Sequence, residues 1–124
     1  MTQVFFIAAG GAVGAVGRFW VSQSVHAWLG RDFPYGTLCV NVFGSLLMGV
    51  LYVLLIERMS VGPEWRGFLT VGLLGAFTTF STFSMETVNL LGGGEPWKAL
   101  LNVISNVLLC VVASGVGVMV ARQV

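Results

Sequence analysis

Four apolar stretches, each long enough to cross a bilayer as a helix, share almost the whole 124-residue sequence among them. They cover residues of about 3–29, 35–57, 66–91 and 97–122, and short segments rich in glycine and proline separate them. A membrane-spanning helix needs about 20 mostly apolar residues, and in lipid its backbone must be hydrogen-bonded internally. We therefore expect an all-α membrane protein in which residues 1–124 form a single four-span domain.

The composition agrees with a membrane protein and excludes several other classes. Hydrophobic residues make up 56% of the chain and charged residues 9%, with a mean hydropathy of +0.92. A soluble domain carries roughly a quarter charged residues. The net charge of +1 provides no basic surface for nucleic acid. Cys39 and Cys110 lack the spacing of a metal site, so we interpret them as small buried residues without a disulfide.

Positive charges at the two ends of the spans give almost no preference for one orientation in the membrane. Arg58, Arg66 and Arg122 belong to the side that holds both termini, and Arg31 and Lys98 belong to the other side. Orientation follows the excess of Lys and Arg in the cytoplasmic loops. A count of three positive charges against two leaves two alternatives open. The protein inserts in both orientations, so that opposed copies can pair, or the small excess suffices for a single orientation.

Polar side chains recur every four residues along two of the spans. They are Thr37, Asn41 and Ser45 in the second span, and Asn102, Asn106, Cys110 and Ser114 in the fourth. Residues four apart lie on one face of a helix. Such groups can simply bond to a neighbouring helix or to their own backbone, but polar groups at membrane depth are costly and tend to mark pathways. We interpret the two stripes as walls of a polar conduit.

The third span contains the stretch GLLGAFTTFSTFSME, residues 72–86. Between Thr78 and Ser84, five of seven residues carry a hydroxyl group. Phe80 and Phe83 are three apart and so share a helix face, where they either pack or turn their electropositive edges toward an anion. Neutral donors suit an anion better than a cation, and apart from Glu57 at the last position of the second span, Glu86 is the only acid within a span.

Glycines mark the faces on which helices are expected to approach closely. Gly10 and Gly14 form a GxxxG pattern that Gly17 extends, and Gly44 and Gly49 lie in the second span. Small residues allow backbones to come together in lipid. The pattern predicts close packing within or between subunits, and we expect an oligomer.

Three segments of the sequence resemble the small fluoride channels of the Fluc or CrcB family. They are GGAVGAVGRF (10–19), GTLCVNVFGSLLMG (36–49) and GLLGAFTTFSTFSME (72–86). The resemblance implies a fluoride-selective passive channel, rather than an enzyme, which exports cytoplasmic fluoride and relieves its toxicity. It also implies an antiparallel, dual-topology homodimer with two pores, crossing the bacterial inner membrane several times.

The resemblance implies roles for single residues as well. Phe80 and Phe83 match the family's phenylalanine pair, Asn41 its pore asparagine, and Arg18 its arginine near the vestibule. The other residues that resemble the family's polar track are Thr37, Ser81, Thr82, Ser84 and Glu86. The fourth span lacks the tyrosine that some relatives place there, so no residue of this span is assigned to the pathway.

A sodium ion at the centre of the dimer is a further implication of the resemblance. Its ligands would be the backbone carbonyls of Gly75 and Thr78. A glycine followed by the β-branched pair Thr78 and Thr79 weakens a helix locally and leaves carbonyls without partners. We therefore expect a break in the middle of the third helix.

Other classes of membrane protein remain as alternatives. A proton-coupled transporter of the small multidrug-resistance type also has four short spans and dual topology, but it needs a deep carboxylate, and Glu86 lies near the end of its span. An intramembrane enzyme would need a catalytic set, and His26 stands alone. A scaffold subunit would need the glycines but not the polar stripes.

Overall fold

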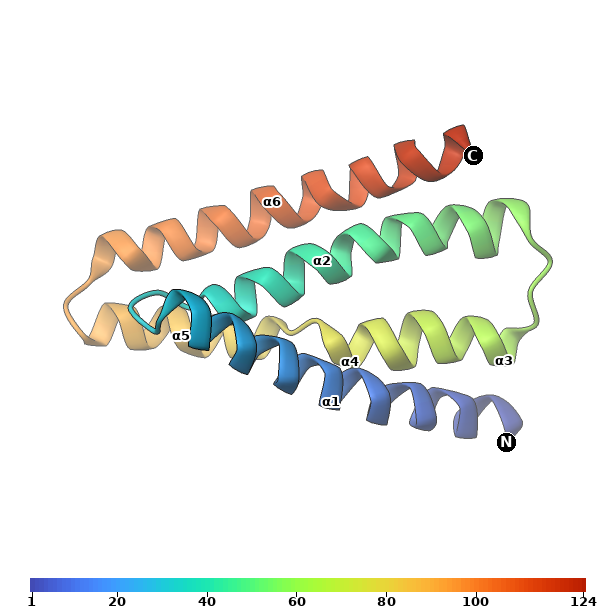
Figure 1. Cartoon of the computed structure of the whole chain (residues 1–124), viewed down its shortest axis with the longest axis horizontal. Helices are drawn as coiled ribbons and strands as arrows, with labels where there is room; N and C mark the ends of the chain where they lie inside the picture. The colour runs from blue at the N-terminus through green and yellow to red at the C-terminus, as the bar shows by residue number, and fades with distance from the viewer.

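The computed structural model describes all 124 residues, and it is helical throughout, without β-strands. Four helical segments are long and apolar enough to cross a membrane: Thr2–Leu29, Tyr35–Arg58, Pro63–Gly92 and Pro96–Gln123. Figure 1 shows both termini at one end of the molecule, together with the connection between the second and third segments. This confirms the predicted all-helical architecture with four candidate spans.

Two of the four segments are single α-helices, and two change their helical type along the chain. The single helices are α1 (Thr2–Leu29) and α6 (Pro96–Gln123). The second segment consists of α2 (Tyr35–Tyr52) and the π-helix η1 (Val53–Arg58). The third consists of α3 (Pro63–Arg66), the π-helix η2 (Gly67–Leu74), α4 (Gly75–Phe77) and α5 (Phe80–Gly92).

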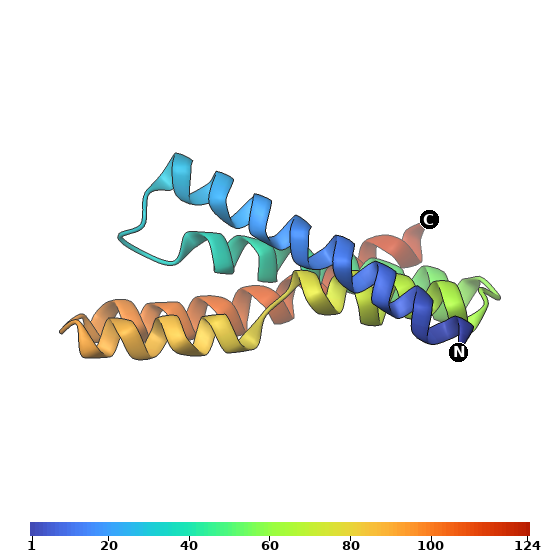
Figure 2. The same ribbon diagram turned by 90° about the horizontal axis from the view of Figure 1, so that it is seen from below.

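The third segment is interrupted at two threonines, within the stretch for which the sequence predicts weakening. Thr78 and Thr79 have extended backbones, with ψ angles of 157° and 124°. The Thr79 hydroxyl then accepts from the Thr82 amide at 3.2 Å and so caps α5. Figure 2 shows the break as a thread of non-helical chain between α4 and α5.

Glycines bring the helix backbones of the subunit into direct contact. A side chain at Gly49 of α2 would collide with the backbone carbonyl of Ser114, and one at Gly117 of α6 would collide with the backbone of α2. Gly10 and Gly14 of α1 lie in the same way against the backbone of η2. These glycines therefore act within the subunit, as van der Waals contact between helices in lipid requires.

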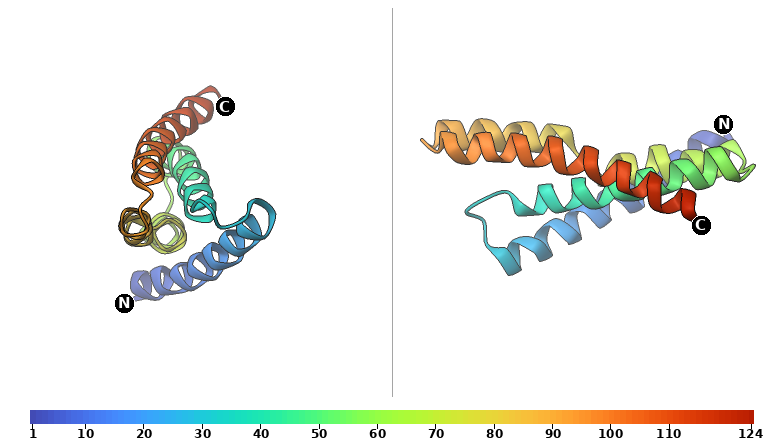
Figure 3. Two further views of the ribbon diagram at one scale, coloured as in Figure 1. Left: turned by 90° about the vertical axis from the view of Figure 1, so that its left-hand side faces the viewer. Right: turned by 90° about the horizontal axis from the view of Figure 1, so that it is seen from above.

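The helices diverge toward the end of the molecule that carries the loops at residues 30–34 and 93–95. Figures 2 and 3 show the second half of α1 and the start of α2 moving away from α5 and the start of α6. At the other end the helices stay together. Between the two ends, Asn41 of α2 contacts the break and α6, and Ser45 contacts α6.

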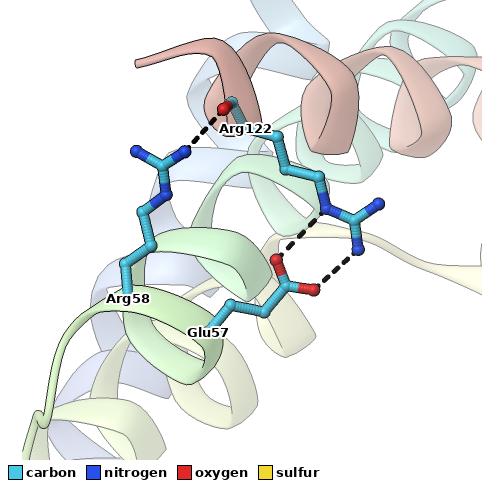
Figure 4. Close-up of polar contacts among 3 residues, drawn as sticks. All are labelled: Glu57, Arg58 and Arg122. Carbon is cyan, nitrogen blue, oxygen red and sulfur yellow. Dashed lines mark hydrogen bonds and ion pairs between the residues drawn. The ribbon is translucent and has the colours of Figure 1, made fainter.

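The end that holds both termini is tied together by ion pairing between η1 and α6. Arg122 donates to both carboxylate oxygens of Glu57, at 2.6 and 3.2 Å, and Arg58 donates to the Arg122 carbonyl (Figure 4). This geometry is bidentate, but the groups are exposed, so the pair contributes little to stability where water reaches it.

Candidate functional site

A cavity of about 350 Å³ lies where the two predicted polar stripes meet the break of the third segment. Asn41 and Ser45 of α2 line it, together with Asn106 and Ser114 of α6 and Thr79 of the break. The Ser114 hydroxyl also donates to the Ser45 carbonyl at 3.0 Å, which fixes the register of the two helices. The central parts of the two predicted stripes therefore face each other in direct contact beside this cavity.

Asn41 binds the backbone of the break at two points. Its Oδ1 accepts from the Thr79 amide at 2.8 Å, and its Nδ2 donates to the Thr79 carbonyl at 3.0 Å. The same Nδ2 donates to Oδ1 of Asn106 at 3.0 Å. Asn41 is buried, so this conformation leaves it no free N–H for an ion.

Phe80 and Phe83 line the same cavity, with ring centroids 5.2 Å apart and planes tilted by 52°. This agrees with the shared helix face that their spacing predicts. Their surroundings differ, since Phe83 is 9% exposed and Phe80 is 67% exposed. The Phe80 ring therefore presents a face that the subunit itself does not cover.

The predicted hydroxyls of α5 divide into two groups. Oγ1 of Thr79 donates to Oγ1 of Thr82 at 3.1 Å, and Oγ of Ser81 lies 3.4 Å from Oγ1 of Thr79. The Thr82 hydroxyl proton has no acceptor within the chain. The Ser84 hydroxyl donates to the carbonyl of Phe80, one turn earlier, at 2.9 Å. Thr82 thus offers a free donor, whereas the Ser84 hydroxyl is already hydrogen-bonded to a carbonyl of its own helix.

Thr37 and Glu86 lie away from this cavity. Thr37 is buried on α2, one turn before Asn41. Glu86 lines a second cavity of about 240 Å³ beside the loop between α1 and α2, together with His26 and Asp32. One carboxylate oxygen of Glu86 is shielded from solvent and has no hydrogen-bond partner in the chain.

Arg18, Gly75 and Thr78 occupy three different settings. Arg18 is half-buried on α1 and makes no hydrogen bond or ion pair within the subunit. Gly75 is exposed at the start of α4. Thr78 lines the first cavity, and its hydroxyl donates to the Leu74 carbonyl at 3.0 Å. The structure therefore gathers only Asn41, Phe80, Phe83 and Thr78 in one space.

Sequence reasoning did not assign Asn106 or Asn102 to the site, although it recognised their stripe. In the structure both are buried and hydrogen-bonded to each other, and Asn106 also accepts from Asn41. The four-residue spacing was the available signal. It could not show that this stripe faces Asn41, because a stripe alone does not say which helix it meets.

Comparison with known proteins identifies the family. Residues 5–118 match the family described as "CrcB-like protein, Camphor Resistance (CrcB)". A relative from Methylococcus capsulatus is 54% identical over 98% of this chain, which spans only 53% of that longer protein. Relatives from Magnetococcus marinus and Shewanella amazonensis are 52% and 56% identical, with 99% and 88% of their lengths matched. All three carry the name "Fluoride-specific ion channel FluC". The chain belongs to the CrcB family.

Proposed function

We propose that this chain forms a passive, fluoride-selective channel through which fluoride leaves the cytoplasm. The observation that carries the proposal is the match to the Magnetococcus relative, which is named a fluoride-specific ion channel and is covered over 99% of its length. The chain is a multi-pass membrane protein whose family has a transport function rather than an enzymatic one.

The groups around the first cavity suit a small, strongly hydrated anion. Such an ion must exchange its water for closely spaced donors that do not bind it too firmly to release it. The Thr82 hydroxyl, which lies outside the lining but is hydrogen-bonded to Thr79 of the lining, is a neutral donor of this kind, and no Lys or Arg side chain lines the cavity. Helix α5 begins at Phe80, so its positively polarised N-terminal end also lies at the cavity.

The two phenylalanines support the same reading. The edge of a phenyl ring is electropositive, so it favours an anion without offering a strong hydrogen bond. Phe80 and Phe83 stand next to each other beside the break. They would replace part of the hydration shell while letting the ion move on. Chloride is larger than fluoride, and a narrow corridor would exclude it.

Two copies in opposite orientations complete the channel in this proposal. The Phe80 ring and the surrounding face are uncovered in a single subunit. The nearly balanced positive charges at the two ends of the spans allow both orientations in the membrane. An antiparallel homodimer would cover these faces and form two pores, one at each subunit's break.

A sodium ion between the two subunits fits the backbone at the break. In a continuous helix the Gly75 carbonyl would accept from the Thr79 amide, but that amide donates to Asn41. The Thr78 carbonyl would accept from the Thr82 amide, which instead donates to the Thr79 hydroxyl. Both carbonyls are therefore available to a hard cation, which prefers oxygen ligands. The ion would supply positive charge between the two pores.

Fluoride export across the bacterial inner membrane is the physiological direction of this activity. Hydrogen fluoride enters cells from acidic surroundings and dissociates inside. The negative membrane potential then drives the anion outward through a passive channel, and this relieves fluoride toxicity without an energy source in the protein.

The alternative of a proton-coupled drug transporter receives no support from the first cavity. Its lining contains no carboxylate, and Glu86 lies in the second cavity, near the loop that follows α1. Proton exchange for a cationic substrate needs an acid at the substrate site.

The proposed function is tested by fluoride efflux from liposomes that contain the purified protein, followed with a fluoride-selective electrode. We expect rapid efflux of fluoride, none of chloride in parallel vesicles, and no dependence on a proton gradient once the charge is balanced by an ionophore. Efflux equal to that of protein-free vesicles, or efflux coupled to protons, would contradict the proposal.

A further inference from the structure

Three asparagines form an unbroken hydrogen-bond chain from the break to the middle of α5. Asn41 donates to Asn106 at 3.0 Å, and Asn106 donates to the side-chain oxygen of Asn102 at 3.0 Å and to its carbonyl at 2.9 Å. Asn102 donates to the Thr87 hydroxyl at 2.9 Å, and Thr87 donates to the Phe83 carbonyl at 2.8 Å. Every link donates in the same direction. The hydrogen-bond chain starts at the break of the third segment and ends at the Phe83 carbonyl of the same segment.

The Thr79 peptide and the Asn106 side chain together set the orientation of the first amide. A backbone N–H can be accepted only by an oxygen, so Asn41 must turn its Oδ1 toward the Thr79 amide and its NH₂ group toward Asn106. Asn106 must then present an oxygen to Asn41 and its own NH₂ group to Asn102. The orientation of each amide follows from that of its neighbour.

The chain is buried and saturated. Asn102 is 0% exposed and Asn106 is 5% exposed. The NH₂ group of Asn106 is used by two acceptors on Asn102, and its Oδ1 by Asn41. Although Asn106 lines the first cavity, it has no donor left for an ion there. Its influence on permeation must therefore pass through Asn41.

We propose that Asn106 is a positioning residue for permeation, because it holds Asn41 in the orientation that keeps the third helix open at Thr79. Without an acceptor at position 106, the Asn41 amide loses its only side-chain support and is free to turn away from the Thr79 peptide. The Thr79 amide would then lose its acceptor, so the break would open to solvent more often, and the rings at Phe80 and Phe83 would shift with α5.

This inference rests on the proposed fluoride conduction for its effect on flux, but its structural part can be measured separately. Hydrogen–deuterium exchange followed by mass spectrometry reports the protection of the amides at residues 75–83 in the purified, membrane-reconstituted protein. Local opening free energies of this kind are read directly from exchange rates. Fluoride efflux from liposomes is the second readout.

The test substitution is Asn106→Leu, which is close in volume and removes the acceptor. We expect exchange at residues 75–83 to rise, and fluoride efflux to fall, each by about tenfold, as the loss of a buried hydrogen bond predicts. The control is Asn89→Leu, the same chemical change on the exposed side of α5, which should leave exchange at residues 75–83 as in the wild type.

A second variant separates support of Asn41 from general damage. Asn106→Thr keeps a neutral hydroxyl that can accept from Asn41 and donate to Asn102, so slow exchange at residues 75–83 should be largely retained relative to Asn106→Leu. Equal loss of protection in Asn106→Thr and Asn106→Leu would overturn the inference. So would reduced efflux in Asn106→Leu with unchanged exchange at the break, because Asn106 would then act on the ion directly. A wild-type protein without efflux would overturn the proposed function and leave the exchange result to decide the role of Asn106.

Discussion

Phe80 and Phe83 are neighbouring rings with opposite surroundings: their centroids are 5.2 Å apart, yet Phe83 is buried within the subunit and Phe80 is open to its outside. Because the Phe83 side chain is buried by residues of its own subunit, this chain alone sets its position. Phe80 acquires its full surroundings only when another surface covers it. The two rings should therefore respond differently to substitution.

Phe83→Ile should reduce fluoride efflux by at least about tenfold, which corresponds to about 1.4 kcal/mol in the barrier. The change keeps apolar bulk and removes the electropositive ring edge. Phe80→Met should have a milder effect, because a flexible thioether fills irregular space. Efflux is measured in liposomes with a fluoride electrode.

The control for these variants is Phe43→Ile, which changes a phenylalanine that packs against Phe77 and does not line the cavity. It should conduct like the wild type, and all three variants should elute unchanged in size-exclusion chromatography. Wild-type efflux in Phe83→Ile would show that the rings are packing residues only.

Asn41→Asp should stop fluoride efflux, with a loss of at least about 100-fold, because a negative charge at the cavity repels the ion. The substitution also removes the donor to the Thr79 carbonyl and to Asn106. Asn41→Leu removes the hydrogen bonds without adding charge and should retain more efflux than Asn41→Asp. Efflux of Asn41→Asp within a few-fold of the wild type would contradict a place in the pathway.

Gly117→Ala should destabilise the folded protein by about 1–3 kcal/mol, the usual range for overpacking, because its Cβ would collide with the backbone of α2. Gly115→Ala provides the matched control on the same helix, since nothing lies within 4 Å of a Cβ there. It should raise stability by about 0.5–1 kcal/mol through helix propensity. Thermal unfolding in detergent measures both, and equal effects would show that α2 and α6 do not touch at Gly117.

Gly75→Leu should abolish stabilisation of the dimer by sodium, whereas Thr78→Val should retain it. A side chain at Gly75 meets only ordinary contacts within the subunit, its nearest neighbour being the Thr70 carbonyl at 3.6 Å from Cβ. A loss of stability in Gly75→Leu would therefore arise from a clash with the partner subunit or from loss of the cation. Thr78→Val keeps the shape and the backbone carbonyl. The measurement is the melting temperature of the dimer in sodium chloride and in choline chloride, and equal tolerance at both positions would count against the site.

Gly92→Lys combined with Glu95→Lys should force one membrane orientation and abolish efflux when the variant is expressed alone. It reverses the charge count, from three against two to three against four. Position 94 is avoided because Gly94 has a φ of 76°, which favours glycine. Co-expression with Met59→Lys combined with Ser60→Lys, which biases the opposite side, should restore efflux. Full efflux from the first variant alone would contradict an antiparallel dimer.

The four helices and the break are predictable from the sequence because the causes are local. A run of about 20 apolar residues in lipid has no alternative to a helix. Gly75 followed by two β-branched threonines weakens that helix, and Thr78 and Thr79 are indeed extended. The four-residue spacing also placed Asn41 and Asn106 on polar faces of their helices.

The π-helical segments η1 and η2 were not predicted. They extend over Val53–Arg58 and Gly67–Leu74, on both sides of the connection between the second and third segments. Intrinsic propensity does not distinguish a π-helix from an α-helix. In η2 the wider winding coincides with close contact to Gly10 and Gly14 of α1, a partner that is distant in the sequence.

The sequence by itself determined that the chain is helical, spans a membrane and carries two polar stripes and a weakened third helix, since each property follows from residues within a few turns of one another. Only the tertiary structure decided that the Asn41 side chain hydrogen-bonds to the Thr79 peptide, and that Asn106 of α6 accepts a hydrogen bond from Asn41. The physical reason is that a polar group buried between helices must be paired, and the choice among equally suitable partners depends on how the helices cross. The crossing is set by Gly49 and Gly117, where the backbones of α2 and α6 meet.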